Sequence, residues 1–185
     1  MRDASVKVLA SLPQAILKAS YDWASSLAGL LTKQGNSTDS QLAALAVHCE
    51  FLCFFMHLAN RTAHSELSAE KAEALQGFLL DTMRRAWVDG YFRDWPETRK
   101  VGIANDFLRK LNDAELEYSR CKGLVSREHM FTANTLMQAF ARNVTELLGH
   151  ENMNPEVFMT VMEHTVSAFT SMHLEEKVRG AGAAL

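Results

Sequence analysis

The sequence predicts an all-α protein, a single-domain bundle of about six helices around one central apolar helix. Apolar residues recur every three to four positions through most of the chain, which is the spacing of one helix face. The period-two alternation that marks strands is not convincing anywhere, and the 185 residues include only 3 prolines and 9 glycines. One segment, at about residues 39–64, is apolar over roughly two-thirds of its circumference, so other helices must surround it.

Length and composition favour one helical domain at residues 1–178, within which residues 1–10 could form a short extra helix. We expect the Gly- and Ala-rich residues 179–185 to be a flexible tail. The formal net charge of −3, with 22% charged residues, gives no electrostatic reason to expect nucleic acid or a membrane surface as a partner. The 3 cysteines, an odd number, and an N-terminal segment without a long apolar core favour a cytoplasmic protein.

The first main helix is expected at about residues 13–33, where Ser11 and Gln14 form a capping box and Pro13 occupies the permissive first turn. The central helix follows, starting at a second capping box made by Thr38 and Gln41. Its length of about 25 residues corresponds to ~38 Å. Helix angles place its polar residues on one narrow side, where we expect the helix to reach solvent or an interface; they are Glu50, His57, Asn60, Arg61 and His64.

These polar residues also bear on the membrane question. Glu50 and the histidines interrupt the apolar run before it reaches about 18 residues, the length that crosses a bilayer. We therefore interpret residues 39–64 as the core helix of a bundle and expect no membrane association.

The later helices have clear start or stop signals. A helix at about residues 69–93 carries acidic residues in its first turn, which suits the helix dipole. The next, at about 97–122, is the most amphipathic, and Gly123 ends it. Its charged face, which includes Lys110 and Glu117, is predicted to lie in solvent. Ser126 caps a helix at about 127–148, and Asn154-Pro155 starts the last one.

Cys49, Cys53 and His57 are spaced four residues apart on the central helix, so they form a slanted row. Thiolate and imidazole are good zinc or copper ligands, which makes these residues a metal-site candidate completed from another helix. No second cysteine pair exists to complete a recognised zinc motif. We therefore expect two buried thiols and a histidine at the bundle edge, and predict no cofactor.

Other histidines admit similar alternatives. Glu50, His57 and His64 repeat every seven residues, but the chain contains no Glu-x-x-His pair of the kind that di-metal bundles use. His48 stands alone on the apolar side, where it could be a haem ligand or, as we expect, a neutral, hydrogen-bonded core histidine.

Trp87, Tyr91, Phe92 and Trp95 gather aromatic side chains at the end of one helix. Tryptophan and tyrosine dominate interface hot spots, although the same residues could close the end of the bundle. We predict that they contribute to a homodimer interface.

No catalytic motif is present: the chain lacks a nucleophile elbow, a P-loop, a dinucleotide fingerprint and a metalloprotease signature. The expected function is therefore non-enzymatic, through protein association, above all self-association. The alternative is a protein, conceivably an enzyme, that binds an apolar small molecule, metal or cofactor between the helices at 39–64, 69–93 and 154–178. In that alternative the polar side of the central helix faces Trp87 and Tyr91, and His164 supplies a further ligand.

Overall fold

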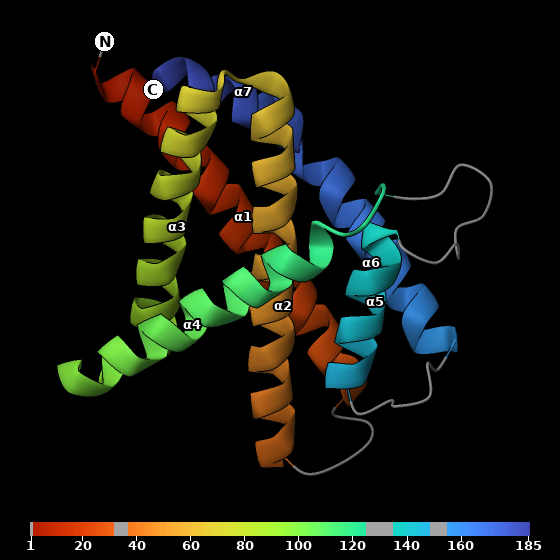
Figure 1. Ribbon diagram of the computed structural model, residues 1–185. Coiled ribbons are helices and arrows are strands. Elements are labelled where there is room, and N and C mark those ends of the chain that lie inside the picture. Colours follow the sequence, from red (N-terminus) through yellow and green to blue (C-terminus); the bar gives the residue numbers. More distant parts are fainter. Residues whose placement is uncertain (1, 32–36, 125–134, 149–154) are drawn as a thin grey trace.

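A computed structural model describes residues 2–31, 37–124, 135–148 and 155–185 (Figure 1). These residues form seven helices and no strand, which confirms the predicted all-α bundle. The helices are α1 (Arg2–Leu31), α2 (Ser37–Glu66), α3 (Ala69–Tyr91), α4 (Glu97–Tyr118), α5 (Leu136–Leu147), α6 (Pro155–Met172) and α7 (Leu174–Ala184).

α2 is the central helix, as its composition predicts. It packs against α1, α3, α4, α5 and α7, and Phe51, Phe54 and Phe55 have no exposed surface. The segment Gln41–Glu66 is long and apolar enough to cross a membrane, with a mean hydropathy of 1.8 in its most apolar window. Since the other helices bury 72% of that window, α2 has the position of a bundle's core helix.

α1 begins earlier than predicted. Pro13 lies inside a continuous helix from Arg2 to Leu31 and does not start it, so residues 1–10 form no separate helix within the described part. An interior proline costs one backbone hydrogen bond, but tertiary packing stabilises both sides of it. Leu12 and Ile16 are fully buried, and α1 packs against α2 and α7.

α3 and α4 diverge like a V from the turn between them, and α4 runs across the bundle at a steep angle to α3 (Figure 1). Ser68 caps α3 by accepting a hydrogen bond from the amide of Lys71, as expected of a helix start. α4 ends at Tyr118, slightly before the predicted limit, and crosses over α2. The predicted start of the next helix at about residue 127 lies outside the described residues, and α5 is described from Leu136.

The C-terminal segment corrects the sequence prediction. The helix does not continue from α6 to residue 178, because His173 adopts the left-handed conformation (φ 48°) and turns the chain into α7. Residues 179–184 are not a flexible tail: they belong to α7, and Ala181 and Gly182 are buried. A Cβ atom at Gly182 would clash with Leu67. The small residues that resemble a frayed end thus permit α7 to lie close to Leu67, in the turn between α2 and α3.

Candidate functional site

The polar side of α2 reaches solvent at Arg61 and His64, as predicted, but its Glu50–His57 part is covered by other helices. α4 crosses directly over it, and α5 covers one part of it. Glu50 and His57 are 1% and 2% exposed. Because buried polar groups need partners, this side of α2 divides into two regions according to which helices supply them.

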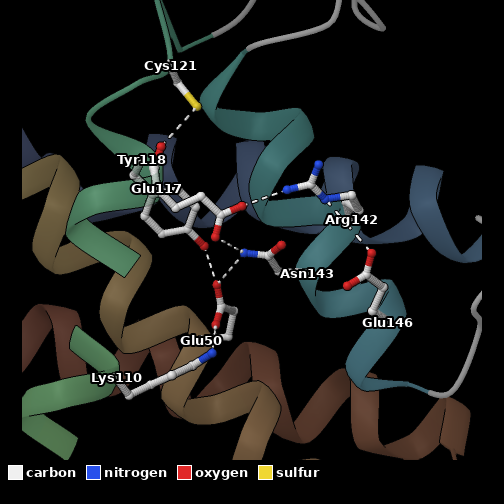
Figure 2. Close-up of polar contacts among 8 residues, drawn as sticks. All are labelled: Glu50, Lys110, Glu117, Tyr118, Cys121, Arg142, Asn143 and Glu146. Carbon is white, nitrogen blue, oxygen red and sulfur yellow. Dashed lines mark hydrogen bonds and ion pairs between the residues drawn. The ribbon is translucent and has the colours of Figure 1, made fainter. Parts of the chain in front are cut away.

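The first region is a closed network around Glu50 (Figure 2). The hydroxyl of Tyr118 on α4 and Nδ2 of Asn143 on α5 (3.1 Å) both donate to Oε1 of Glu50. Nζ of Lys110 lies 3.3 Å from Oε2. Burial, followed by the negative charge of Glu50, raises the pKa of Tyr118 well above its usual value, so its hydroxyl remains a donor. This network joins three helices, and we call it the Glu50 network.

The Glu50 network extends to the surface through α5. Nδ2 of Asn143 also donates to Oε2 of Glu117 (3.0 Å), and the guanidinium of Arg142 lies 2.6 Å from Oε1 of Glu117 (Figure 2). Lys110 and Glu117 were predicted to be in solvent on the outer face of α4. Both are partly exposed, and both pair with residues of other helices. Lys110 joins α4 to α2, and Glu117 joins α4 to α5.

The second region is centred on Glu115 of α4. Nδ1 of His57 donates to Oε2 of Glu115 (2.8 Å), and Nδ2 of Asn60 donates to Oε1 (3.3 Å). Burial alone would raise the pKa of Glu115, but these two hydrogen bonds and the charge of His57 outweigh it and lower the pKa below 4.5. Glu115 is therefore an ionised, well-oriented carboxylate. The described residues offer no partner to Nε2 of His57 or Oδ1 of Asn60, although both atoms are buried.

Beside Glu115 the bundle contains a cleft of about 510 Å³ between α2, α3 and α4. Its lining comes from the first half of α3 and the second halves of α4 and α2, away from the turn that joins α3 to α4. Most of its lining is apolar: Met56, Ala59, Ala63, Leu75, Leu79, Leu80, Leu108 and Leu111. Its polar residues are Asn60, Glu73, Gln76, Asn112 and Glu115, and Gly77 completes the wall. We call this space the α2–α3–α4 cleft.

His48 lies on the opposite side of α2 and is 6% exposed. A hydrogen bond joins its Nδ1 to the hydroxyl of Tyr91, and its ring contacts those of Tyr21 and Trp87. Burial lowers the pKa of His48 to about 4. It is thus a neutral core histidine with a hydrogen bond, as expected.

The three residues of the metal candidate do not converge on one point. Cys49 and Cys53 are buried, and the hydrogen bond to Cys49, together with burial, raises the pKa of the Cys53 thiol well above its usual value. A protonated thiol is a poor ligand. His57 directs Nδ1 to Glu115 instead. Within the described segments no group of three or more His, Cys, Asp or Glu side chains could hold a metal ion.

The aromatic segment at the end of α3 is partly absorbed by the bundle. Trp87 is 7% exposed and stacks on Phe107 of α4 with ring centres 5.4 Å apart. Tyr91 and Trp95 remain 40% and 45% exposed, and Phe92 lies between them in contact with both. Of the four aromatic residues predicted to form an interface, Tyr91 and Trp95 are the two whose side chains are exposed.

The alternative site predicted from the sequence is not assembled. His164 of α6 packs on Trp23 of α1 with ring centres 4.8 Å apart. Trp87 and Tyr91 contact His48 and not the polar side of α2. The cleft lies between α2, α3 and α4. The site predicted from the sequence had the last helix of the chain in place of α4.

No family model matches this chain, and searches of curated proteins and of solved structures return no significant match.

Glu115 was not among the predicted site residues. Its position on α4 is adjacent to the buried Ala114, and it is separated from His57 by 58 positions in sequence. A usable signal was present in α2: His57 and Asn60, spaced three apart on the central helix, require hydrogen-bond partners from whichever helix covers them.

Proposed function

We propose that this protein binds a small, mainly apolar molecule in the α2–α3–α4 cleft. The observation that carries the proposal is the cleft itself: a volume of about 510 Å³ with an apolar lining and a few polar groups. Ligand sites in proteins are typically concave, about 300–1,000 Å³ in volume, and lined in this way. The polar network that fixes Glu115 adds an oriented group at the edge of the apolar surface.

A matched pair of glycines on α3 provides the test. A Cβ atom at Gly77 or at Gly90 would meet no atom within 4 Å, but only Gly77 lines the cleft. Gly77→Phe should therefore fill the cleft without disturbing the fold, and Gly90→Phe is the control with the same change in composition and helix propensity.

The probe is N-phenyl-1-naphthylamine, an uncharged dye whose fluorescence rises in apolar surroundings. The wild type and Gly90→Phe should bind it saturably with equal affinity, and Gly77→Phe should bind it at least about tenfold more weakly. Equal binding by Gly77→Phe and the wild type, with both variants folded, would place any dye site elsewhere and overturn the proposal.

Self-association is a second candidate, favoured by the exposed side chains of Tyr91 and Trp95. Such side chains are common interface anchors. Trp95→Glu is the appropriate variant, because Tyr91 also pairs with the buried His48. If this surface forms a homodimer, light scattering after size exclusion should give twice the chain mass for the wild type and the monomer mass for Trp95→Glu. A wild-type monomer at all concentrations tested would exclude the homodimer.

A further inference from the structure

The charged residues of the cleft lining are all acidic. Glu73 of α3 and Glu115 of α4 are both part of the lining, and none of the lining residues is Lys or Arg. Even when His57 is protonated and balances Glu115, Glu73 leaves a net negative charge. A long-range field of this kind favours cations and disfavours anions.

Glu115 is held in a way that suits recognition. His57 and Asn60 each donate to one of its carboxylate oxygens from the buried side. Each oxygen has capacity for a further hydrogen bond, and the side chain of Glu115 retains 37% of its exposure. The carboxylate is therefore oriented before any ligand arrives, which reduces the entropy lost on binding.

Apolar surface lies next to this carboxylate. Met56, Ala59 and Leu111 line the same cleft as Glu115, and the first two are buried residues of the central helix. A molecule that satisfies both surfaces needs an apolar body and a positively charged, hydrogen-donating head.

We infer that the ligand is a lipophilic amine. Its ammonium group pairs with Glu115, and its apolar body lies against Met56, Ala59 and Leu111. This inference rests on the proposed function. Glu73, on the facing wall, adds attraction for the same charge. Charge-assisted hydrogen bonds to an oriented carboxylate are stronger than those between neutral groups, so the head group determines which apolar molecules bind best.

The test compares three probes that share one alkyl chain: octylammonium, 1-octanol and octanoate. Calorimetric titration of the wild type should give affinity for octylammonium about tenfold above 1-octanol, with octanoate the weakest. Because this comparison uses only the unmodified protein, it does not depend on whether any variant folds.

Two conservative variants locate the charge effect. Glu115→Gln retains the shape of the side chain and an acceptor for His57, and it should reduce the preference for octylammonium over 1-octanol to less than about threefold. Glu73→Gln, at an exposed position, should reduce it by a smaller factor. Gly90→Phe is the control and should retain the full preference.

The outcomes separate the two proposals. If 1-octanol or octanoate binds as tightly as octylammonium, and Gly77→Phe weakens all three, the cleft binds ligands but the amine inference is wrong. If the preference survives in both Glu115→Gln and Glu73→Gln, the inference is also wrong. If none of the three probes nor the uncharged dye binds the wild type, the proposed function fails and the amine inference fails with it.

Discussion

The two regions on the polar side of α2 begin from similar residues and end differently. At Glu50, α4 and α5 both reach the carboxylate, and Tyr118, Asn143 and Lys110 surround it. At His57 and Asn60, the acceptor is the carboxylate of Glu115 on α4, and the cleft between α2, α3 and α4 lies beside it. The first region is closed by a third helix, and the second opens to solvent.

The difference shows that a buried polar face can either hold helices together or bind a ligand, depending on which helices cover it. Where covering helices provide the partners, the polar atoms bind the elements to one another. Where a covering helix is missing, an oriented polar group adjoins apolar surface, and a ligand or water can complete it. Four predictions test this comparison.

The largest effect should come from the aromatic core under both regions. Phe54 is fully buried, and its ring centre lies 5.9 Å from that of Tyr118 and 4.2 Å from that of Phe140. Phe54→Ala should lower the free energy of unfolding by about 3–5 kcal/mol, measured by urea denaturation. Leu116→Ala, at a position 53% exposed, is the control and should change it by about 0.5 kcal/mol or less. A loss below about 1 kcal/mol for Phe54→Ala would show that the regions do not share this support.

The next effect concerns pH and His48, which lies on the apolar side of α2 and is hydrogen-bonded to the hydroxyl of Tyr91. The unfolded chain protonates His48 near its ordinary pKa of 6.5, whereas burial lowers the folded pKa to about 4. The unfolded state therefore binds more protons in this window, and stability falls as the pH drops through it. The contribution of His48 at pH 4 should be about 3 kcal/mol less favourable than at pH 7. Urea denaturation of the wild type and His48→Gln across this range should show the difference, and parallel profiles would contradict it.

The third prediction compares the closed and open regions directly. Glu50→Ala leaves the buried hydroxyl of Tyr118 without its acceptor, which should cost about 2–3 kcal/mol. Glu115→Ala removes an acceptor at the open region, where water in the cleft can replace it, and should cost about 1 kcal/mol or less. Denaturation curves of the two variants under the same conditions test this order. Equal costs would mean that the cleft does not hydrate His57, and the distinction between the regions would be lost.

The smallest effect is the acid response of Glu115 itself. Its pKa is lower in the folded protein than its ordinary value of 4.5. A depressed carboxylate contributes stability that is present above the unfolded pKa and is lost as the pH falls through the folded pKa. The wild type should therefore lose more stability than Glu115→Gln below about pH 4.5, by a small amount because Glu115 is half-exposed. A variant that loses stability as steeply as the wild type would show that His57 does not stabilise the ionised form.

Much of the fold could be predicted from local sequence. The apolar circumference of α2 required burial, and Phe51, Phe54 and Phe55 are fully buried. The helix expected from about residue 69 is α3, which begins at Ala69, and Asn154-Pro155 marked the start of α6, which begins at Pro155. These signals are readable because each depends on residues within one or two turns of a helix.

The errors in the fold predicted from the sequence share one cause. Pro13 and the Gly-Ala residues 179–184 were interpreted from local propensity as a helix start and a flexible end. Packing of α1 against α2 and α7, and the close approach of Gly182 to Leu67, override those propensities. Local preferences amount to about 1–3 kcal/mol at a glycine or proline, which buried contacts between helices can exceed.

What the sequence by itself determined is the helical class, the central position of α2 and the polar composition of one of its sides. What only the tertiary structure decided is the fate of that side: Glu50 in a closed network, and His57 and Asn60 against Glu115 beside a cleft. The partners lie 55 or more positions away along the chain. Helical periodicity shows which residues of one helix share a face. It cannot show which other helix covers that face, because packing of the whole bundle sets the angles at which α3, α4 and α5 cross α2.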